Sequence, residues 1–374
     1  MKNEISTPAA VDSGSPTLAI RGIQVPIRCA SLVPTMDFFV QRLGFRIDAI
    51  FPADAPRTAM LSGHGVSLRL GPDVRGNCDL LYLLCDDPAQ FGETRDITAP
   101  NGLRIRLVDA DPDMSLPETA QALHVSRLDP DTSWTVGRAG LRYRDLLPER
   151  HGGAFIASHI RILEGGPVPD YVHYHKVRFQ MIFCRKGWVR VVYEGQGEPF
   201  VLNAGDCVLQ PPQIRHRVLE SSRGAEVIEL GSPAEHITMV DHAMTLPTLE
   251  RYPANFDFHG QRFVRHVAAA AEWRPWRQIG FEYADTGIGA ATDGLAGARV
   301  VRRTPISAPH DTMKYDAEFC FFFVLTGKLV VRHGGAAHAL QADDSITLPG
   351  NEAYVFESMS DDLALLEVTL PDRV

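Results

Sequence analysis

The stretch "HYHKVRFQMIFCRKG" (His173–Gly187) decides how this chain is interpreted. Two histidines, separated by one residue, precede a glutamine and an apolar run that ends at glycine. On a β-strand, side chains at i and i+2 point to the same side, about 6 to 7 Å apart. Two such imidazoles can reach one cation, at about 2.1 Å each for zinc. The pattern therefore predicts half of a metal site at the entrance of a strand.

A second stretch, "GDCVLQPPQIRH" (Gly205–His216), contains features that could complete this site. It is typical of a glycine turn, a strand, a proline turn and a histidine that enters the next strand. From residue 140 onward the chain is a series of short apolar-alternating runs between glycine and proline turns. We therefore expect a mainly β structure, a sandwich or barrel, in this region.

Together the two stretches resemble the cupin family, whose usual motifs are G-x5-H-x-H-x4-E-x6-G and G-x5-P-x-G-x2-H. His173, His175, Gly187, Gly205, Pro211 and His216 match in register. Gln180 replaces the usual glutamate, Gln213 replaces a glycine, and Gly166 stands one position before the expected opening glycine. The resemblance implies that His173, His175, Gln180 and His216 hold one divalent transition metal inside a small β-barrel. The competing interpretation is that these polar groups only line a barrel mouth.

The change from glutamate to Gln180 bears on the chemistry. Neutral ligands alone leave the +2 charge of the cation uncompensated, which makes it a stronger Lewis acid. The change also removes a carboxylate that could act as a base at the metal. Some cupin dioxygenases hold iron by three histidines alone, so Gln180 is either a ligand or a neighbour of the metal.

The C-terminal two thirds of the chain contain an internal repeat. "FQMIFCRKGWVRVV" (Phe179–Val192) is similar to "FCFFFVLTGKLVVR" (Phe319–Arg332), which aligns Gly187 with Gly327. Further upstream, Arg144–Leu146 matches Arg277–Ile279, a separation of 133 residues, whereas Gly187 and Gly327 are 140 residues apart. The difference predicts about seven extra residues in the second copy. The positions of the four implied ligands are taken in the second copy by Met313, Tyr315, Cys320 and Tyr354. We expect this second barrel to be metal-free and structural, or to bind a different ligand.

The N-terminal part differs, with an expected order of β-α-β-β-β. With "MDFFVQRLGF" (36–45) and "APNGLRIRLVDA" (99–110), it resembles one module of the glyoxalase/bleomycin-resistance (vicinal oxygen chelate) family. Its first and last strands carry no ligand of the kind that family uses, so we expect a structural or dimerising module. The expected domains are a disordered tail (1–20), this module (21–112), a linker (113–140), a metal-binding cupin barrel (141–246) and a second, metal-free cupin barrel (247–374). The predicted fold is thus mainly β, two cupin jelly-roll barrels (double-stranded β-helices) after a small α+β module.

Composition excludes several classes of partner. The formal charge is -9 and no long run of lysine or arginine occurs, so nucleic-acid binding has little electrostatic support. The apolar runs are too short for a membrane span. Six cysteines without a C-x-x-C pair, and a first segment without the apolar core of a signal peptide, favour reduced thiols in a cytoplasmic protein. The expected partner is a small-molecule substrate, and a homodimer is left open.

Two catalytic candidates follow from strand alternation. Glu220 lies four residues after His216, on the same predicted face as His216 and Val218, where it could act as a base; a solvated strand end is an equally good interpretation. Arg190 or Arg178 could bind a substrate carboxylate. His236, Asp241 and His242 could cap the barrel mouth, although a solvated linker is the favoured interpretation.

Three functions fit these observations. The first is a dioxygenase-like enzyme whose metal, Fe(II) by preference or else Mn, Ni or Zn, chelates a small carbonyl, enol or aromatic substrate. The second is a non-redox lyase, isomerase or hydrolase that uses the metal as a Lewis acid. The third is a small-ligand binding protein without turnover.

Overall fold

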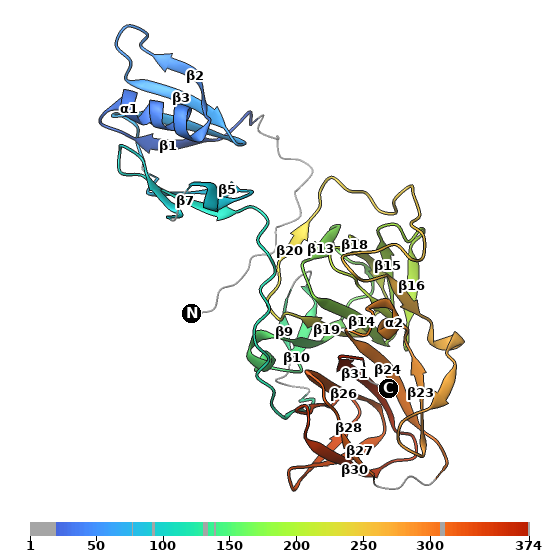
Figure 1. Ribbon diagram of the computed structural model, residues 1–374. Helices are drawn as coiled ribbons and strands as arrows, with labels where there is room; N and C mark the ends of the chain where they lie inside the picture. Colours follow the sequence, from blue (N-terminus) through green and yellow to red (C-terminus); the bar gives the residue numbers. More distant parts are fainter. Residues whose placement is uncertain are drawn as a thin grey trace. The chain divides into compact units, whose positions relative to one another are not determined.

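The computed structural model describes residues 20–76, 78–91, 94–129, 134–137, 140–306 and 311–372 (Figure 1). Apart from Ile20, the expected disordered tail lies outside the described residues. The chain divides into two compact units, residues 1–113 and 114–374. Among the described residues, no helix has the length and apolar character needed to cross a membrane.

The first unit begins with a four-stranded sheet in the order β1-β4-β3-β2, in which β1 and β4 are parallel and the other neighbours are antiparallel. A short helix that continues into a π-helical turn connects its first two strands and packs into the same core through Leu32 and Phe39. The elements are β1 (Gln24–Arg28), α1 (Leu32–Asp37), η1 (Phe38–Arg42), β2 (Arg46–Phe51), β3 (Thr58–Gly63) and β4 (Val66–Gly71).

A second, three-stranded sheet in the order β5-β7-β6 shares this core through Ile97, Ile105 and Leu107. Its elements are β5 (Leu80–Cys85), η2 (Pro88–Phe91), β6 (Asp96–Thr98) and β7 (Arg104–Asp109). The structure thus has more strands than the expected β-α-β-β-β order, because a βαβββ unit is already complete at Gly71 and β5, β6 and β7 follow it in the same compact unit. The missed strand, β2, is exposed along most of its length, so its sequence lacks the alternation that marks a half-buried strand.

The second unit contains two β-barrels, each made of two facing sheets. The sheets of the first barrel run β21-β17-β14-β19-β11-β10-β9 and β16-β15-β18-β13-β20, and β12 pairs with β18. Its strands are β9 (Thr135–Val136), β10 (Arg142–Asp145), β11 (Ile156–Ile162), β12 (Gly166–Pro167), β13 (His173–His175), β14 (Phe179–Lys186), β15 (Trp188–Tyr193), β16 (Phe200–Asn203), β17 (Cys207–Leu209), β18 (His216–Ser221), β19 (Ala225–Ser232), β20 (Thr238–Val240) and β21 (Val264–His266). A short 3-10 helix, η4 (Arg150–Gly153), precedes β11.

The sheets of the second barrel run β22-β23-β24-β31-β26-β29-β8 and β25-β30-β27-β28. Its elements are β8 (His124–Ser126), η5 (Ala268–Ala270), β22 (Trp273–Pro275), β23 (Phe281–Asp285), α2 (Ile288–Ala291), β24 (Gly297–Arg303), β25 (Thr312–Lys314), β26 (Phe319–Thr326), β27 (Lys328–His333), β28 (Ala336–Gln341), β29 (Ser345–Thr347), β30 (Ala353–Met359) and β31 (Ala364–Leu370). The mainly β architecture expected from the sequence is confirmed.

Strand pairing shows that the two barrels are copies of one plan. β14 lies between β17 and β19 as β26 lies between β29 and β31, and both carry an irregularity at the same place, Cys184/Lys186 and Val324/Thr326. The same register makes Tyr143 the counterpart of Tyr283 and Arg144 the counterpart of Ala284. The sequence match of Arg144–Leu146 to Arg277–Ile279, and the seven extra residues derived from it, were wrong. That match was a local similarity, and residues 277–279 lie in the turn before β23.

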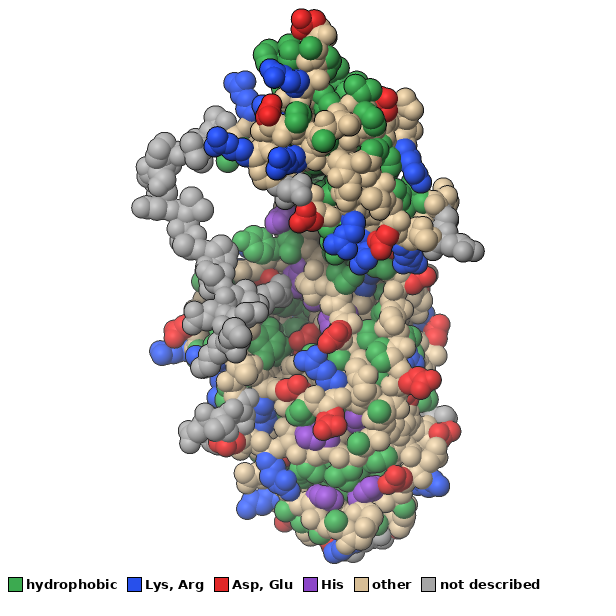
Figure 2. Space-filling model, turned by 90° about the vertical axis from the view of Figure 1, so that its left-hand side faces the viewer, with side chains coloured by type: hydrophobic (Ala, Val, Ile, Leu, Met, Phe, Trp, Pro, Cys, Tyr) green, Lys and Arg blue, Asp and Glu red, His purple; other side chains and the backbone are tan. Residues whose placement is uncertain are grey.

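The two barrels exchange edge strands and share a core. β8 precedes the first barrel in sequence but pairs with β29 of the second, whereas β21 lies in the second expected domain and pairs with β17 of the first. The segment expected as a linker thus supplies β8 and β9. One apolar cluster contains Phe155, Phe179 and Met181 together with Phe319 and Phe321, so the barrels pack directly against each other. On the face drawn in Figure 2, acidic and basic side chains are interspersed.

The interiors of the barrels differ in side-chain volume. By the common register, Ile182 and Val218 of the first barrel correspond to Phe322 and Phe356 of the second. Both phenylalanines belong to the buried cluster that fills the second barrel. The smaller residues of the first barrel instead line a cavity.

Candidate metal centre

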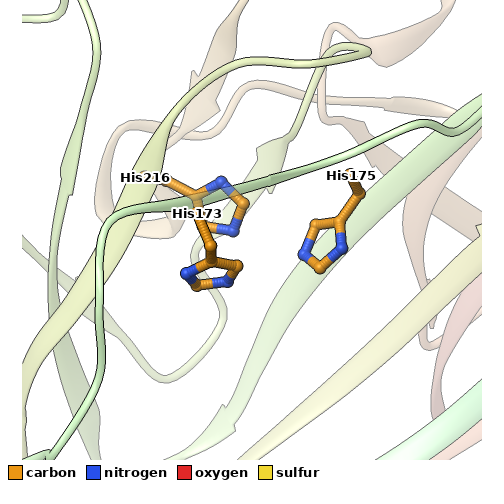
Figure 3. Close-up of side chains that lie close together, drawn as sticks. All are labelled: His173, His175 and His216. Carbon is orange, nitrogen blue, oxygen red and sulfur yellow. The ribbon is translucent and has the colours of Figure 1, made fainter. Parts of the chain in front are cut away.

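Three histidines converge inside the first barrel (Figure 3). His173 and His216 are directly opposite each other on β13 and β18, and His175 lies one strand step further on the same face. One ring nitrogen from each of the three lies within 4.8 Å of the others. Their ring centroids are 4.2, 5.2 and 5.3 Å apart. The structure thus brings together, from two separate segments of the chain, the three histidines identified from sequence.

Hydrogen bonds orient these rings. The Nδ1 atoms of His173 and His216 lie 2.7 and 3.0 Å from the carbonyl oxygens of Tyr171 and Ile214. Because a carbonyl only accepts, Nδ1 carries a proton in both rings, so Nε2 is the atom through which each ring, when neutral, can bind a cation. His175 Nδ1 lies 2.9 Å from the Thr238 hydroxyl. A hydrogen bond on one ring nitrogen that leaves the other to bind a cation is the usual arrangement of metal-binding histidine.

The histidines lie at the wall of a cavity of about 430 Å³. This volume is in the range of small-molecule sites. Most of the wall is aliphatic, and its polar side chains come from both sheets. The described lining residues that carry polar side-chain groups are Thr135, Tyr143, Ser158, His173, His175, Tyr193, Gln210, His216, Glu229, His236 and Thr238.

Glu229 is the one carboxylate among the described lining residues, and the sequence analysis missed it. It lies on β19 opposite Ile182 of β14, in the sheet that faces the one carrying the histidines. The amide of Gln180 donates a hydrogen bond of 2.6 Å to its Oε1. Gln180 is itself buried and lies beside Glu229, on the neighbouring strand, rather than among the described lining residues. The barrel therefore keeps an acidic group, displaced by one strand from its expected position.

Two further side chains lie against the histidines. The Tyr193 ring stacks on His216 at 5.5 Å, and burial raises the pKa of this phenol far above its ordinary value, so it stays protonated. The His236 ring lies 5.3 Å from that of His175, and its Nδ1 donates to the Pro233 carbonyl at 3.0 Å. A solvated linker was the favoured interpretation of this segment from sequence, whereas His236 lines the cavity.

Comparison with known protein families shows which family the first barrel resembles. The family model described as the cupin domain matches residues 159–230, which include the strands that carry His173, His175, Gln180 and His216. Residues 159–230 thus match the cupin domain, and the barrel that contains them is called the cupin domain below. Comparison with curated protein sequences gives no match.

Several solved structures are similar to this chain over much of its length. A mutant of the Bacillus subtilis oxalate decarboxylase OxdC is 15% identical over 65% of this chain and 76% of its own, with a TM-score of 0.48. A mutant of the salicylate 1,2-dioxygenase from Pseudoaminobacter salicylatoxidans is 15% identical over 68% of this chain and 85% of its own, also with a TM-score of 0.48. The Escherichia coli protein Ylba is 11% identical over 70% of this chain and 94% of its own, with a TM-score of 0.46.

The cupin domain does not place the two catalytic candidates, Glu220 and Arg190, in its cavity. They pair with each other across β15 and β18 at 3.3 Å, with side chains 38% and 42% exposed. Arg190 is opposite Glu220, whereas the adjacent Val191 is opposite Val218, so Leu219 is an extra residue, a β-bulge, in β18. One extra residue reverses the alternation, so Val218 lines the cavity and Glu220 does not.

The remaining charged candidates also have partners outside the cavity. Arg178 binds the Glu318 carboxylate of the second barrel at 3.0 and 3.1 Å. Arg215 lies 3.5 Å from Asp241 and covers the Tyr174 ring. His242 contacts the ring of Tyr171. These contacts give Arg178 and Arg215 structural roles.

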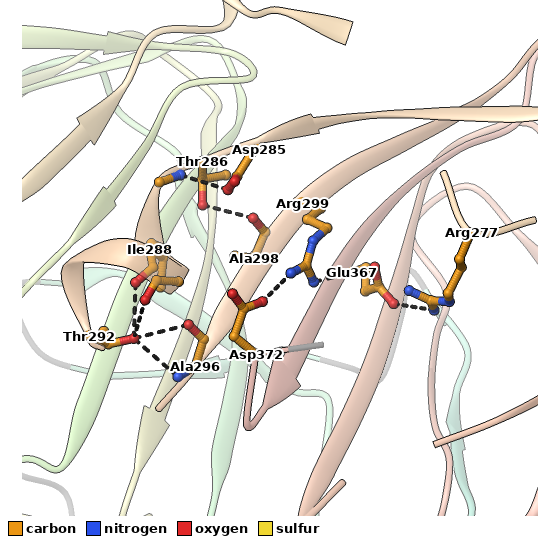
Figure 4. A network of polar contacts seen from close by, with 12 residues as sticks. Arg277, Asp285, Thr286, Ile288, Thr292, Ala296, Ala298, Arg299, Glu367 and Asp372 are labelled. Atoms are coloured by element: carbon orange, nitrogen blue, oxygen red, sulfur yellow. Dashed lines mark hydrogen bonds and ion pairs between the residues drawn. The ribbon is translucent and has the colours of Figure 1, made fainter. Parts of the chain in front are cut away.

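The second barrel has lost the histidine set, as expected from sequence. Met313 is opposite Tyr354 on β25 and β30, just as His173 is opposite His216 in the cupin domain. The counterpart of Glu229 is Glu367, which is completely buried. Figure 4 shows Arg277 bound to this carboxylate.

A second group of potential ligand atoms lies between the barrels. His159, Glu226 and Asp343 place one such atom each within 4.8 Å of the others. His159 and Arg161 both donate to Glu226, at 2.9 and 3.0 Å. Asp343 accepts hydrogen bonds of 3.0 Å and 2.5 Å from Arg185 and Arg144, the latter on its backbone carbonyl. Three guanidinium groups already outweigh two carboxylates, so the cluster joins the barrels without needing a cation.

Proposed function

We propose that this chain is a metal-dependent enzyme that acts on a small organic substrate inside the cupin domain. The observation that carries the proposal is the convergence of His173, His175 and His216 within 4.8 Å at the wall of a cavity. Imidazoles oriented by hydrogen bonds at Nδ1, to carbonyl oxygens for His173 and His216 and to a hydroxyl for His175, suit a divalent transition metal, Fe(II) first and otherwise Mn, Ni or Zn. We assign the metal to these three residues, with Gln180 as a neighbour.

A metal held there would polarise a substrate oxygen as a Lewis acid or, as Fe(II), support oxygen chemistry. The chain itself supplies the rest of the site. The aliphatic wall, including Ile160, Ile182 and Val227, excludes water and fits an apolar substrate body. Glu229 presents an anionic group from the opposite sheet, where it can bind a donor or accept a proton. Tyr193 stays neutral and keeps the His216 ring in place.

Glu229 favours the non-redox candidate beside the dioxygenase-like one. Neutral ligands make the metal a stronger Lewis acid, but the change to Gln180 also removes the base that such chemistry needs. Glu229 restores a carboxylate to the same cavity. A carboxylate near a Lewis acid is the usual means of moving a proton in lyase and isomerase chemistry. We therefore propose lyase or isomerase chemistry as the second candidate.

The experiment that tests the proposal separates these chemistries. The stripped protein is reloaded in turn with Fe(II), Mn(II), Ni(II) and Zn(II) and screened against small keto, enol and phenolic acids. An oxygen electrode measures O₂ uptake, and NMR measures product. O₂ uptake with Fe(II) alone supports the dioxygenase, whereas product without O₂ uptake supports the non-redox enzyme. Turnover that is unchanged in His216→Ala would contradict both.

The third alternative, a binding protein, predicts ligand binding without product for every metal. The N-terminal module remains a predicted structural or dimerising module, and its likeness to the glyoxalase family remains a proposal.

A further inference from the structure

The three histidines of the cupin domain are oriented by two kinds of partner. His173 and His216 each donate from Nδ1 to a backbone carbonyl two residues earlier in their own segment, at 2.7 and 3.0 Å. His175 instead has the side-chain hydroxyl of Thr238, which is directly opposite it on β20 and lies 2.9 Å from its Nδ1. A carbonyl only accepts, whereas a hydroxyl donates or accepts. The orientation of the third histidine therefore depends on a side chain from another strand.

That strand, β20, has little hold on the barrel core. It is the last strand of its sheet, and within the described part of the chain it pairs with β13 alone. All three of its residues are exposed, and none of them belongs to an apolar cluster of the described residues. Backbone hydrogen bonds attach it, including one of 2.8 Å from Asp241 to Val172 just beyond its end. A short edge strand with so few buried contacts opens at a low cost in free energy.

The segment that leads into β20 also forms part of the cavity wall. His236 lines the cavity together with Thr238, and its ring lies perpendicular to that of His175 at 5.3 Å. The Nδ1 atom of His236 donates to the Pro233 carbonyl at 3.0 Å, which directs the ring. The position of residues 233–240 thus decides both how His175 is held and where two further polar groups lie at the cavity.

We propose that Thr238 positions His175 for the metal, so that metal binding and the attachment of β20 to β13 stabilise each other. Binding through Nε2 of His175 keeps its Nδ1 as a donor to the Thr238 hydroxyl, and this hydrogen bond adds to those that attach β20. Because such a coupling is reciprocal, whatever Thr238 adds to metal affinity the metal adds to the stability of β20. The inference rests on the proposed function for the presence of a metal. It adds that the loaded site has a firmer wall, with His236 in place, than the metal-free one.

The affinity of the full chain for Zn(II) alone tests the positioning role. It is measured by competition with a chromophoric chelator for the parent, Thr238→Val, Thr238→Ser and Thr248→Val. Valine keeps the shape and the strand preference of threonine but makes no hydrogen bond, whereas serine keeps the hydroxyl. We expect Thr238→Val to bind Zn(II) about tenfold to a hundredfold more weakly, and Thr238→Ser to stay close to the parent. Thr248→Val is the control, because the Thr248 hydroxyl bonds the backbone of Gly195 and Glu250.

Hydrogen exchange of the amides of residues 237–241 tests the coupling in the same four proteins, with and without Zn(II). Loading should slow this exchange in the parent, in Thr238→Ser and in Thr248→Val, because the hydrogen bond from His175 then holds β20 more firmly. The slowing should be clearly smaller in Thr238→Val, which lacks that bond.

Equal Zn(II) affinity of the parent and Thr238→Val overturns the inference. So does a loss in Thr238→Ser as large as that in Thr238→Val, which would assign the effect to packing of the methyl group, and so does exchange that Zn(II) leaves unchanged in the parent. A parent that loads Zn(II) but gives any of these results refutes this inference alone. A parent that loads none of the four metals of the proposed function refutes that function, and this inference with it.

Discussion

The amide nitrogen of Gln180 lies 2.6 Å from a carboxylate oxygen of Glu229. This contact explains the departure from the usual cupin motif. A glutamate at position 180 would face Glu229 at hydrogen-bond distance, and two buried carboxylates there would repel each other. A glutamine donates instead. The cupin domain therefore has its acidic group on β19 rather than β14.

Restoring the usual motif with Gln180→Glu is expected to destabilise the protein. Two facing carboxylates raise the pKa of one of them in the folded state, so the penalty is full above that raised pKa and disappears as the pH falls below the ordinary carboxyl pKa. We expect a loss of about 1–3 kcal/mol at pH 7, measured by urea unfolding. The double variant Gln180→Glu/Glu229→Gln should recover most of it, and a double variant as unstable as the single one would show that the pair does not interact.

The contact between the barrels should make stability depend on pH. Burial opposes the charge of Glu226, but the hydrogen bond from His159 and the positive charge of Arg161 prevail and lower its pKa to about 2. Because the folded pKa is lowered, its contribution is present above the ordinary value of 4.5 and is lost as the pH falls toward 2. The shift corresponds to about 3 kcal/mol.

Urea unfolding at a series of pH values compares the parent with Glu226→Gln. The difference in unfolding free energy should be largest near neutral pH and shrink steadily as the pH falls below about 4.5. A difference that stays constant with pH would mean that Glu226 contributes by packing rather than by charge.

The second barrel should not tolerate loss of one member of its internal ion pair. Arg277→Met leaves the buried Glu367 without its main partner, and we expect a loss of about 3–5 kcal/mol in the free energy of unfolding. Arg277→Met/Glu367→Gln should be clearly more stable than Arg277→Met. Additive losses in the double variant would contradict the pairing.

Filling the cavity should abolish ligand binding without removing the metal. Ile182→Phe copies the residue that the second barrel has at Phe322. Its cost in stability should stay within about 1–3 kcal/mol, as for overpacked cores. The small keto, enol or phenolic acid that the parent binds should lose at least tenfold in affinity, measured by calorimetry, with unchanged metal content. Full affinity in this variant would place the ligand elsewhere.

Motif spacing, through its resemblance to the cupin family, was enough to predict the barrels and the three histidines. The pair His173 and His175 has the period of a strand, and His216 follows a glycine and a proline turn at fixed distances. The loss of the set in the second barrel could be predicted for the same reason, since Met313 and Tyr354 stand at aligned positions. These signals are local in sequence, and the barrel only brings them together.

The other features of the site and the fold depend on strand register and on side-chain contacts, which the spacing of a motif does not specify. The bulge at Leu219 reversed the face of Glu220, and nothing in "HRVLESS" marks that extra residue. Glu229 is one of two glutamates in an otherwise mostly apolar strand, and its role becomes apparent only from its contact with Gln180. The one available signal was the repeat, because Glu367 stands at the corresponding position of the second copy. The exchanged strands β8 and β21 are three residues each, too short for a periodic pattern.

The content of divalent metal per chain tests the central claim most directly. The parent, His173→Ala, His216→Ala and the control His338→Ala, which changes a histidine on β28 of the second barrel, are purified alike and analysed by mass spectrometry. We predict up to one metal per chain in the parent and the control, and at least a tenfold loss in His173→Ala and His216→Ala. Metal content in these two variants equal to that of the parent would contradict the account.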